Sequence, residues 1–244
     1  MRRALVVGGS NGIGLSIVTI LAGRADIEKI YIIDKAPFPD YYLTKKTDYY
    51  SFDLTNSDYS IFDSFSDIDT LVITAGFGKL ALFKDIDEAL ISTYFNVNTL
   101  PVLRIIKHFY NKLLSQDDFY CGVMVSIAGF MSSHFFSVYG ATKAALKIFI
   151  ESINVELEKA GSTNRILNVS PGAIKGTNFN NSGTDLEQLK ELGNQILSEM
   201  EMKNDLFIPL YEKVYQEVLR RYYEDFRSEG RHSYDYKLNS GRID

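Results

Sequence analysis

Short apolar runs alternate with longer segments of helical periodicity over the first 170 residues, and this alternation constrains the fold more than any other feature. Several of the apolar runs are unbroken, as is typical of strands that are buried on both faces of a sheet. Strands that alternate with helices favour an α/β fold with a doubly wound parallel sheet. The predicted strands are Ala4–Gly8, Ile30–Asp34, Tyr49–Phe52, Thr70–Thr74, Gly122–Ser126 and Ile166–Ser170.

The predicted helices lie between these strands and after the last of them. A break is expected near Pro101, inside the longest helical segment. The predicted segments are Gly12–Gly23, Asp58–Phe65, Asp87–Leu114, Tyr139–Ala160, Asp185–Lys203 and Pro209–Ser228. Gly176–Gly183 is rich in Gly, Asn, Ser and Thr and is predicted to be a loop, and Tyr234–Gly241 predicts no more than a short strand.

These segments predict a single domain over residues 1–244. Its core takes up about residues 1–177, and residues 178–244 form a lid and C-terminal helices. The stretch after residue 177 is too short for a second hydrophobic core. In a doubly wound fold, ligands bind at the carboxyl ends of the strands, so a loop and helix pair at this point would cover a bound ligand.

Charge and composition exclude several classes of function. The net charge of −5 leaves no general basic surface, so neither nucleic acid nor an anionic membrane is expected as a partner. No signal peptide is expected, and the apolar runs fall short of the roughly 20 residues of a membrane helix. The single cysteine, Cys121, fits a reducing compartment, so a cytoplasmic location is expected. His108, His134 and His232 are too scattered to form a metal site, and no metal is expected.

A glycine-rich stretch follows the first strand and opens the first helix. Glycines at such a turn let the backbone approach a pyrophosphate, and the helix N-terminus supplies free N–H groups and a positive dipole end. The spacing is Gly-x-x-x-Gly-x-Gly, without the lysine of a P-loop. The alternative is a glycine-rich turn without a ligand. The residues predicted to contact a dinucleotide here are Gly8, Ser10, Asn11, Gly12, Ile13 and Gly14.

Asp34 ends the second strand, 20 residues after Gly14. A carboxylate at this position can accept hydrogen bonds from the adenosine ribose hydroxyls. Its negative charge would repel the 2′-phosphate of NADP, and the adjacent Lys35 would soften that repulsion. The sequence therefore favours NAD as the cofactor over NADP. The alternative is a solvated carboxylate at the strand end.

Further motifs follow in an order that resembles the short-chain dehydrogenase/reductase family, over about Leu5 to Thr177. The positions that match the family's catalytic residues are Asn98, Ser126, Tyr139 and Lys143. The positions that match its cofactor contacts outside the glycine turn are Asp34, Lys35, Asp53, Leu54, Ala75, Gly76, Tyr139, Lys143, Pro171, Gly172, Ile174 and Thr177.

The chain departs from the family pattern at several places. Val7 replaces the usual threonine of the glycine turn, and Ile73 and Thr74 stand where the family commonly has two asparagines. Gly176 occupies the place of the family's threonine after the Pro-Gly pair, and Thr177 follows one residue later. The C-terminal tail shares little with the family, so the resemblance carries over neither the lid nor the oligomeric state.

The resemblance implies a Rossmann fold and an NAD(P)-dependent oxidoreductase that acts on the CH–OH group of a small alcohol or on the matching ketone. It also implies a homodimer or homotetramer that pairs the helical segments Leu100–Leu114 and Tyr139–Ala160, whose apolar residues could equally pack into the core. A second interpretation is a cofactor-binding sensor or interaction protein with little catalysis. A third is a sugar-nucleotide epimerase or dehydratase, which usually has a larger C-terminal domain.

The string Tyr-x-x-x-Lys occurs four times in the chain. Only Tyr139 enters a helical segment, where residues four apart share a face, and only Tyr139 follows a strand-end serine, Ser126, by 13 residues. A free phenol has a pKa of about 10, and a neighbouring ammonium such as that of Lys143 lowers it. Tyr139 is therefore the predicted acid/base, and the alternative is a half-buried tyrosine at a helix start. The strings taken as background are Tyr31/Lys35, Tyr41/Lys45 and Tyr42/Lys46.

The resemblance also implies roles for the remaining catalytic positions. Ser126 would donate a hydrogen bond to the substrate oxygen, where negative charge develops, and Asn98 would complete a proton path through water. Lys143 would also bind the nicotinamide ribose. Aromatic and apolar residues after Ser126 hint at a hydrophobic ligand, unless they pack the lid. They are Phe130, Met131, His134, Phe135 and Phe136.

Overall fold

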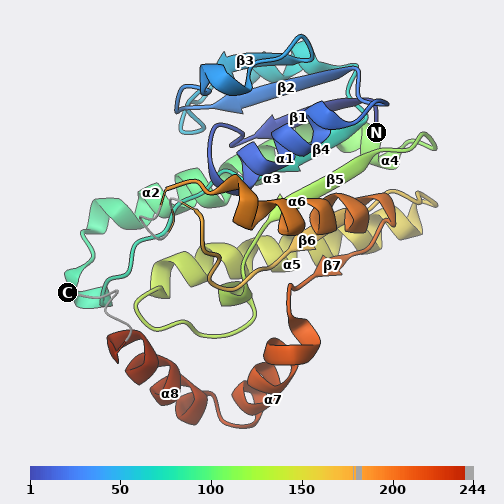
Figure 1. The fold of residues 1–244 in the computed structure, drawn as a ribbon. Coiled ribbons are helices and arrows are strands. Elements are labelled where there is room, and N and C mark those ends of the chain that lie inside the picture. Colours follow the sequence, from blue (N-terminus) through green and yellow to red (C-terminus); the bar gives the residue numbers. More distant parts are fainter. Residues whose placement is uncertain (178, 180–182, 240–244) are drawn as a thin grey trace.

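The computed structural model describes residues 1–177, 179 and 183–239. Within this part of the chain, seven strands form one parallel sheet in the order β3-β2-β1-β4-β5-β6-β7 (Figure 1). The strands are β1 (Arg3–Val7), β2 (Lys29–Asp34), β3 (Thr47–Ser51), β4 (Thr70–Ile73), β5 (Tyr120–Met124), β6 (Ile166–Val169) and β7 (Leu206–Phe207). The strand order reverses between β1 and β4, so the predicted doubly wound sheet is confirmed.

Helices cover both faces of this sheet. On one face, α1 (Gly12–Gly23) packs against α6 (Leu186–Glu201), and on the other lie α3 (Leu100–His108) and α5 (Ser137–Lys159). Alternate side chains of β1 enter the two resulting cores, as the two-residue period of a strand dictates. The other helices are α2 (Glu88–Asn98), α4 (Tyr110–Leu114), α7 (Gln216–Glu224) and α8 (Phe226–Asn239). In the described part of the chain, no helix is long and apolar enough to cross a membrane.

The long helical segment before β5 breaks between α2 and α3, as predicted. The break falls at Thr99, whose backbone (φ −120°, ψ −64°) is not helical. Pro101 lies in the first turn of α3, where its missing N–H costs no helical hydrogen bond. Asn98 is thereby left as the last residue of α2, fully buried.

The predicted helix Pro209–Ser228 is interrupted. A π-helical segment at Tyr211–Tyr215 precedes α7, and Asp225 then separates α7 from α8. The carboxylate of Asp225 accepts the backbone N–H groups of Arg227 and Ser228, and so caps the start of α8. The two helices form a separate pair beyond the sheet (Figure 1).

The predicted short strand at Tyr234–Gly241 is wrong up to Asn239, because these residues continue α8. Residues 240–241 lie outside the described part of the chain, as do residues 178 and 180–182 of the predicted loop Gly176–Gly183. An ion pair between Arg221 and the buried Glu229 joins α7 to α8 (2.7 Å). The helix pair therefore has its own internal contact.

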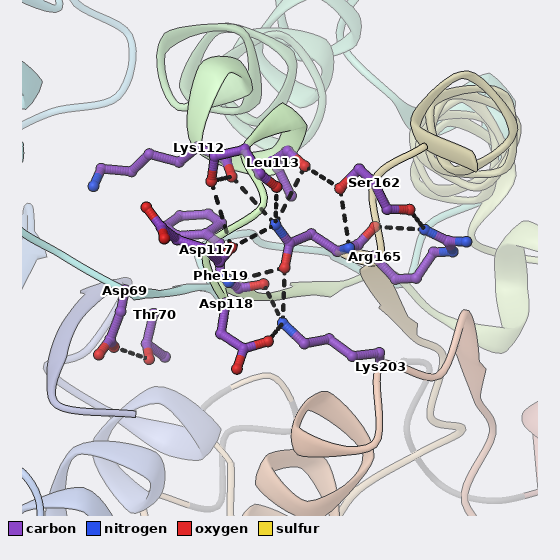
Figure 2. Close-up of polar contacts among 12 residues, drawn as sticks. Asp69, Thr70, Lys112, Leu113, Asp117, Asp118, Phe119, Ser162, Arg165 and Lys203 are labelled. Carbon is purple, nitrogen blue, oxygen red and sulfur yellow. Dashed lines mark hydrogen bonds and ion pairs between the residues drawn. The ribbon is translucent and has the colours of Figure 1, made fainter. Parts of the chain in front are cut away.

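A buried polar network lies at the amino ends of β5 and β6 (Figure 2). The Oδ1 of the fully buried Asn164 accepts hydrogen bonds from the N–H of Phe119 and from the Lys203 ammonium, each at 2.9 Å. Lys203 also donates to the Phe119 carbonyl and lies 3.4 Å from Asp118. The Asn164 amide nitrogen, which has two hydrogens to donate, lies 2.9 Å from the main-chain oxygen of Asp117 and 3.2–3.4 Å from those of Ser115, Lys112 and Leu113.

Candidate active site

A cavity of about 760 Å³ opens at the carboxyl ends of the central strands, next to the point where the strand order reverses. Most of the predicted site residues line it. They are Gly8, Asn11, Gly12, Ile13, Gly14, Asp34, Lys35, Asp53, Leu54, Ala75, Gly76, Ser126, Tyr139, Pro171, Gly172, Ile174 and Thr177. Ser10, Asn98 and Lys143 are buried, and Asn98 and Lys143 lie next to the lining residue Gly76. The fold therefore gathers the predicted residues at one site.

Close packing explains the glycines of the first turn. Gly8 has a left-handed φ of +88°, and a side chain at Gly14 would overlap the Gly8 carbonyl. The Thr74 hydroxyl donates a hydrogen bond to that carbonyl at 2.9 Å. Thr74 thus ties the end of β4 to the turn, at a place where the family commonly has asparagine.

The N-terminus of α1 points into the same cavity. The N–H of Gly12 donates to the hydroxyl of Thr184 at 2.8 Å, and Asn11 caps the helix without a side-chain hydrogen bond. No acidic residue lies in the first turn, so the positive end of the helix dipole is available to an anion. Thr184 was not predicted as part of the site, because it is 172 residues away from Gly12 in the sequence and the two meet only in the folded chain. A turn of this kind fits the diphosphate of a dinucleotide.

Asp34 is held rigidly at the end of β2. Its two carboxylate oxygens accept the N–H groups of Ser10 (2.9 Å) and Ala36 (3.0 Å). The adjacent Lys35 turns away and pairs with Asp53 at 2.8 Å. The Lys35 ammonium, together with hydrogen bonds from Thr55, lowers the pKa of Asp53 to about 2. Lys35 thus forms an ion pair with Asp53, and both residues line the same end of the cavity as Asp34.

Ser126 and Tyr139 meet at the carboxyl end of β5. Ser126 precedes a 3-10 turn, Ile127–Gly129, and its hydroxyl accepts the N–H of Ala128 (3.1 Å). Tyr139 lies in the first turn of α5 and is buried. Burial raises the pKa of Tyr139 to about 12, against the opposing effect of a hydrogen bond with Ser126.

Lys143 lies one helical turn after Tyr139, with its ammonium 5.7 Å from the centre of the tyrosine ring. The ammonium donates to the carbonyl of Met124 at 2.9 Å, and burial lowers the pKa of Lys143 to about 8. The expectation that Lys143 lowers the pKa of Tyr139 is not met, because burial of the phenol dominates and raises that pKa. Tyr139 and Lys143 lie close together, as predicted. The pKa of Tyr139, however, is raised and not lowered.

The buried side chain of Asn98 joins the backbone at Phe77 to α5. Its side chain exchanges two hydrogen bonds of 2.9 Å with the backbone of Phe77, and its amide nitrogen also donates to the Thr142 hydroxyl at 3.3 Å. A side chain at Gly76 would come within 3.5 Å of both Asn98 and the Lys143 ammonium. These contacts fix α5 against the end of β4.

The Pro171–Thr177 segment forms the far wall of the cavity. Gly176 has a left-handed φ of +73°, which explains why glycine replaces threonine at this position. The hydroxyl of the next residue, Thr177, donates to the carbonyl of Ile174 at 3.2 Å. A side chain at Gly172 would overlap the hydroxyl of Tyr215, which lines the cavity from the π-helical segment.

The C-terminal helices contribute two residues that the sequence did not predict, Tyr215 and Lys237. Lys237 of α8 donates to the Ser133 hydroxyl (2.7 Å) and to the carbonyl of His134 (2.8 Å). Of the residues expected to shape the pocket, Phe136 lines the cavity, whereas Phe135 is buried against the ring of Tyr234. No sequence pattern marks Tyr215 or Lys237, because both depend on how the helix pair packs.

A doubly wound parallel sheet with a glycine turn at its reversal point defines a Rossmann fold. The family model described as short chain dehydrogenase matches residues 2–188 of the chain. The chain belongs to the short-chain dehydrogenase family.

Named relatives agree with this membership. Dehydrogenase RED2 of Cochliobolus heterostrophus is 31% identical over 170 residues, which cover 66% of this chain and 63% of that protein. Sorbitol-6-phosphate 2-dehydrogenase of Klebsiella pneumoniae is 31% identical over 189 residues, covering 71% of this chain and 69% of that protein. The chain spans about three fifths of the length of the first curated relatives that it matches, at 63%, 59% and 59%.

Solved structures share the fold. A short chain dehydrogenase from Burkholderia cenocepacia in complex with NADP superposes with a TM-score of 0.76 at 20% identity, covering 96% of this chain and 99% of that one. A short-chain dehydrogenase from Sphingobium yanoikuyae in complex with NADPH gives a TM-score of 0.74 at 20% identity, covering 93% and 95%. At such identities the likeness establishes the fold alone.

Proposed function

We propose that the chain is an NAD(P)-dependent oxidoreductase that interconverts an alcohol and a carbonyl compound, with Tyr139 as the acid/base. The observation that carries the proposal is the joint position of Tyr139 and Ser126 on the wall of one cavity, with Lys143 a helical turn behind. The glycine turn and the N-terminus of α1 supply a fitting cradle for a dinucleotide. When bound, the nicotinamide would supply or accept the hydride.

The protein's own groups would handle the substrate oxygen and its proton. Ser126 would hydrogen-bond the oxygen, and Tyr139 would donate a proton to it during reduction or accept one during oxidation. A tyrosine with a pKa of about 12 stays protonated at neutral pH, which favours carbonyl reduction. Oxidation needs the phenolate, so its rate should rise as the pH increases towards that value. Lys143, with a pKa of about 8, can exchange a proton near neutrality, and Asn98 would position Phe77 and α5.

For the cofactor we propose NAD(H) in preference to NADP(H). Asp34 presents a fixed carboxylate where the adenosine ribose would lie, and Lys35 is directed to Asp53. A phosphate on the ribose would approach the Asp34 charge without a directed counter-charge from Lys35. Relatives of known structure include complexes with NADP and NADPH, so both cofactors belong in any assay.

We also propose a homodimer built through α5. Its surface exposes Ile148 and Val155, which lie seven residues apart and therefore on one face of the helix. Leu100, at the start of α3, is exposed as well. An apolar stripe of this kind is typical of a surface that another subunit covers.

The central test is Tyr139→Phe, which removes the phenol and keeps the ring. Oxidation of NADH and NADPH is followed spectroscopically with a panel of ketones and aldehydes. We expect wild-type turnover with NADH and a fall of about a hundredfold or more in the variant, because general acid catalysis contributes about 10²–10⁴-fold. Cofactor affinity, measured by fluorescence titration, should change little.

Tyr31→Phe is the matched control, since Tyr31 begins the same Tyr-x-x-x-Lys string on β2. It should retain wild-type turnover. Equal rates for Tyr139→Phe and wild type on a turned-over substrate would refute the role of Tyr139. Tight cofactor binding without turnover of any compound would favour the interpretation as a sensor.

A further inference from the structure

We infer that the substrate is a ketone or aldehyde that carries an aromatic ring, or the matching alcohol, and that Phe77 and Phe136 bind this ring beside Tyr139. The inference rests on the proposed function, because it names the class of carbonyl compound that the same cavity would accept. It narrows the expected hydrophobic ligand to an aromatic one. The evidence lies in how the two phenylalanine rings are held near the proposed acid/base.

The cavity has two chemically different ends. Among its described lining residues, the adenosine end carries the charged side chains of Asp34, Lys35 and Asp53. Aromatic rings of the lining instead pack around Tyr139, and they belong to Phe77, Phe136 and Phe179. The end of the cavity beside Tyr139 therefore suits an apolar substituent on the carbonyl carbon.

Phe77 is held in a fixed orientation after strand β4. Its ring stacks on that of the buried Tyr94, with the ring centroids 4.6 Å apart and the planes inclined by 12°. The side chain of Asn98 bonds both the N–H and the carbonyl of Phe77 at 2.9 Å. Tyr94 is fixed as well, because its hydroxyl accepts the N–H of Lys79 at 2.9 Å. A substrate ring that packs on Phe77 would extend an aromatic pair that the fold already holds in place.

The glycines on either side of Phe77 bring this segment close to the reacting groups. A Cβ atom at Gly76 would lie 3.5 Å from the Lys143 ammonium, and one at Gly78 would lie 3.0 Å from the ring of Tyr139. The segment that carries Phe77 therefore passes directly along the proposed acid/base and its lysine.

Phe136 approaches Tyr139 from the start of α5. The two ring centroids lie 5.3 Å apart, with the planes inclined by 52°. Phe179 lies 5.3 Å from Tyr139 and 5.8 Å from Phe136, and the Lys237 ammonium lies 5.6 Å from the centre of the Phe136 ring. Rings that already pack against one another lose little conformational freedom when they bind a further ring.

Two rings held in this way favour a flat aromatic substituent over an aliphatic one of the same size. Aromatic pairs gain electrostatic attraction between ring edges and ring faces in addition to the burial of apolar area. An aliphatic ring gains the burial alone. The quantity that tests the inference is therefore the ratio of kcat/KM for an aromatic ketone to that for the matched aliphatic ketone.

Two matched pairs of ketones provide this ratio. Phenylacetone is compared with cyclohexylacetone, and 2-naphthylacetone with its decahydro analogue. In each pair one CH2 group separates the carbonyl from the ring, so the two carbonyls have closely similar reactivity. With saturating reduced cofactor, we expect wild-type kcat/KM to be about fivefold or more higher for the aromatic member of at least one pair, because a single aromatic pair contributes roughly two- to tenfold.

The variants are Phe77→Leu, Phe136→Leu and Phe136→Tyr. Each leucine variant should lower the aromatic-to-aliphatic ratio by about threefold or more, whereas Phe136→Tyr keeps a ring and should keep the ratio. Phe83→Leu is the control and should show the wild-type ratio, because Phe83 is exposed and stands outside the described lining of the cavity. A merely structural role for Phe77 or Phe136 would lower kcat/KM for both ketones by the same factor and leave the ratio unchanged.

Thermal stabilisation of the cofactor complex by each ketone gives a second readout that does not need turnover. Stronger stabilisation by the aromatic member, reduced in both leucine variants, supports the inference. Equal kcat/KM within each pair, a preference for the aliphatic member, or an aromatic preference that survives in both leucine variants overturns it.

The two proposals fail in different ways. Turnover of ketones without an aromatic preference overturns the inference and leaves the proposed function standing. Absence of turnover with every ketone counts against the proposed function, and stabilisation then decides the inference by itself. In that case, equal or absent stabilisation by the two members of each pair overturns the inference as well.

Discussion

At the scale of single residues, the buried Lys143 is proposed to serve catalysis but lowers the stability of the fold. The side chain is buried, and burial lowers its pKa from 10.5 to about 8. The charged form is therefore disfavoured in the folded protein, and this cost is fully present below pH 8. It fades as the pH rises from about 8 to 10.5, where the unfolded chain also loses the proton.

We expect Lys143→Met to abolish turnover and to raise the free energy of unfolding at pH 7 by about 2 kcal/mol, since each pKa unit corresponds to roughly 1.4 kcal/mol and the hydrogen bond to Met124 is lost. The gain should shrink at pH 10. Urea denaturation of both proteins at the two pH values measures the effect. Lys147→Met, which removes a surface ion pair with Glu151, is the control and should bring no gain. Lower stability of Lys143→Met at pH 7 would contradict the argument.

The sequence predicted Tyr139 with Ser126 and Lys143 from their spacing at a strand end and a helix start, and Asn98 from the resemblance to the family. It did not predict the pKa of Tyr139 correctly. The pKa of a buried phenol depends on how much water and which dipoles surround it, and those are properties of the folded cavity. Candidate residues could be chosen from the sequence, whereas the environment that sets their pKa values could not be.

At the scale of elements, Asn164 holds together the loops that precede β5 and β6. Asn164→Ala would leave the buried N–H of Phe119 and several carbonyls without their partner. We expect a loss of about 3 kcal/mol in the free energy of unfolding, because each unsatisfied buried group costs roughly 1–3 kcal/mol. Chemical denaturation measures this loss, and kcat should be unchanged because the network lies at the amino ends of the strands, whereas the cavity lies at their carboxyl ends.

Asn204→Ala provides the comparison for this prediction. Asn204 is exposed, and its amide bonds the carboxylate of Glu199 at the surface. Its replacement should cost much less than that of Asn164. Similar losses for the two variants would show that the buried network contributes nothing special.

Elements with a strong periodic pattern were predicted well, and elements that depend on remote partners were not. The six predicted strands all occur, with ends that differ by a few residues. Strand β7 was missed because it has two residues, Leu206 and Phe207, and exists through hydrogen bonds to Asn168 and Ser170 of the β6 region. The start of α8 was missed because the sequence does not show whether Asp225 continues the preceding helix or caps a new one.

At the scale of the whole molecule, the proposed dimer can be tested directly. Ile148→Glu combined with Val155→Glu places two negative charges on the exposed stripe of α5, so we expect a monomer with an unchanged fold. Sedimentation equilibrium measures the mass, and circular dichroism checks the fold. Tyr41→Glu, at an exposed aromatic residue distant in sequence from α5, should leave the assembly intact. If wild type is itself a monomer at micromolar concentration, the proposed interface is wrong.

The π-helical segment before α7 contributes Tyr215, and α8 contributes Lys237, to a cavity whose remaining described lining comes from the first 179 residues. The match to the family ends at residue 188, before this pair begins. The part of the chain that matches the family and the part that adds Tyr215 and Lys237 to the cavity are therefore separate stretches of the sequence. If the proposed function holds, exchange of the C-terminal segment among relatives would change which compound the cavity accepts without altering the proposed catalytic residues, a route open to natural recombination and to directed evolution alike.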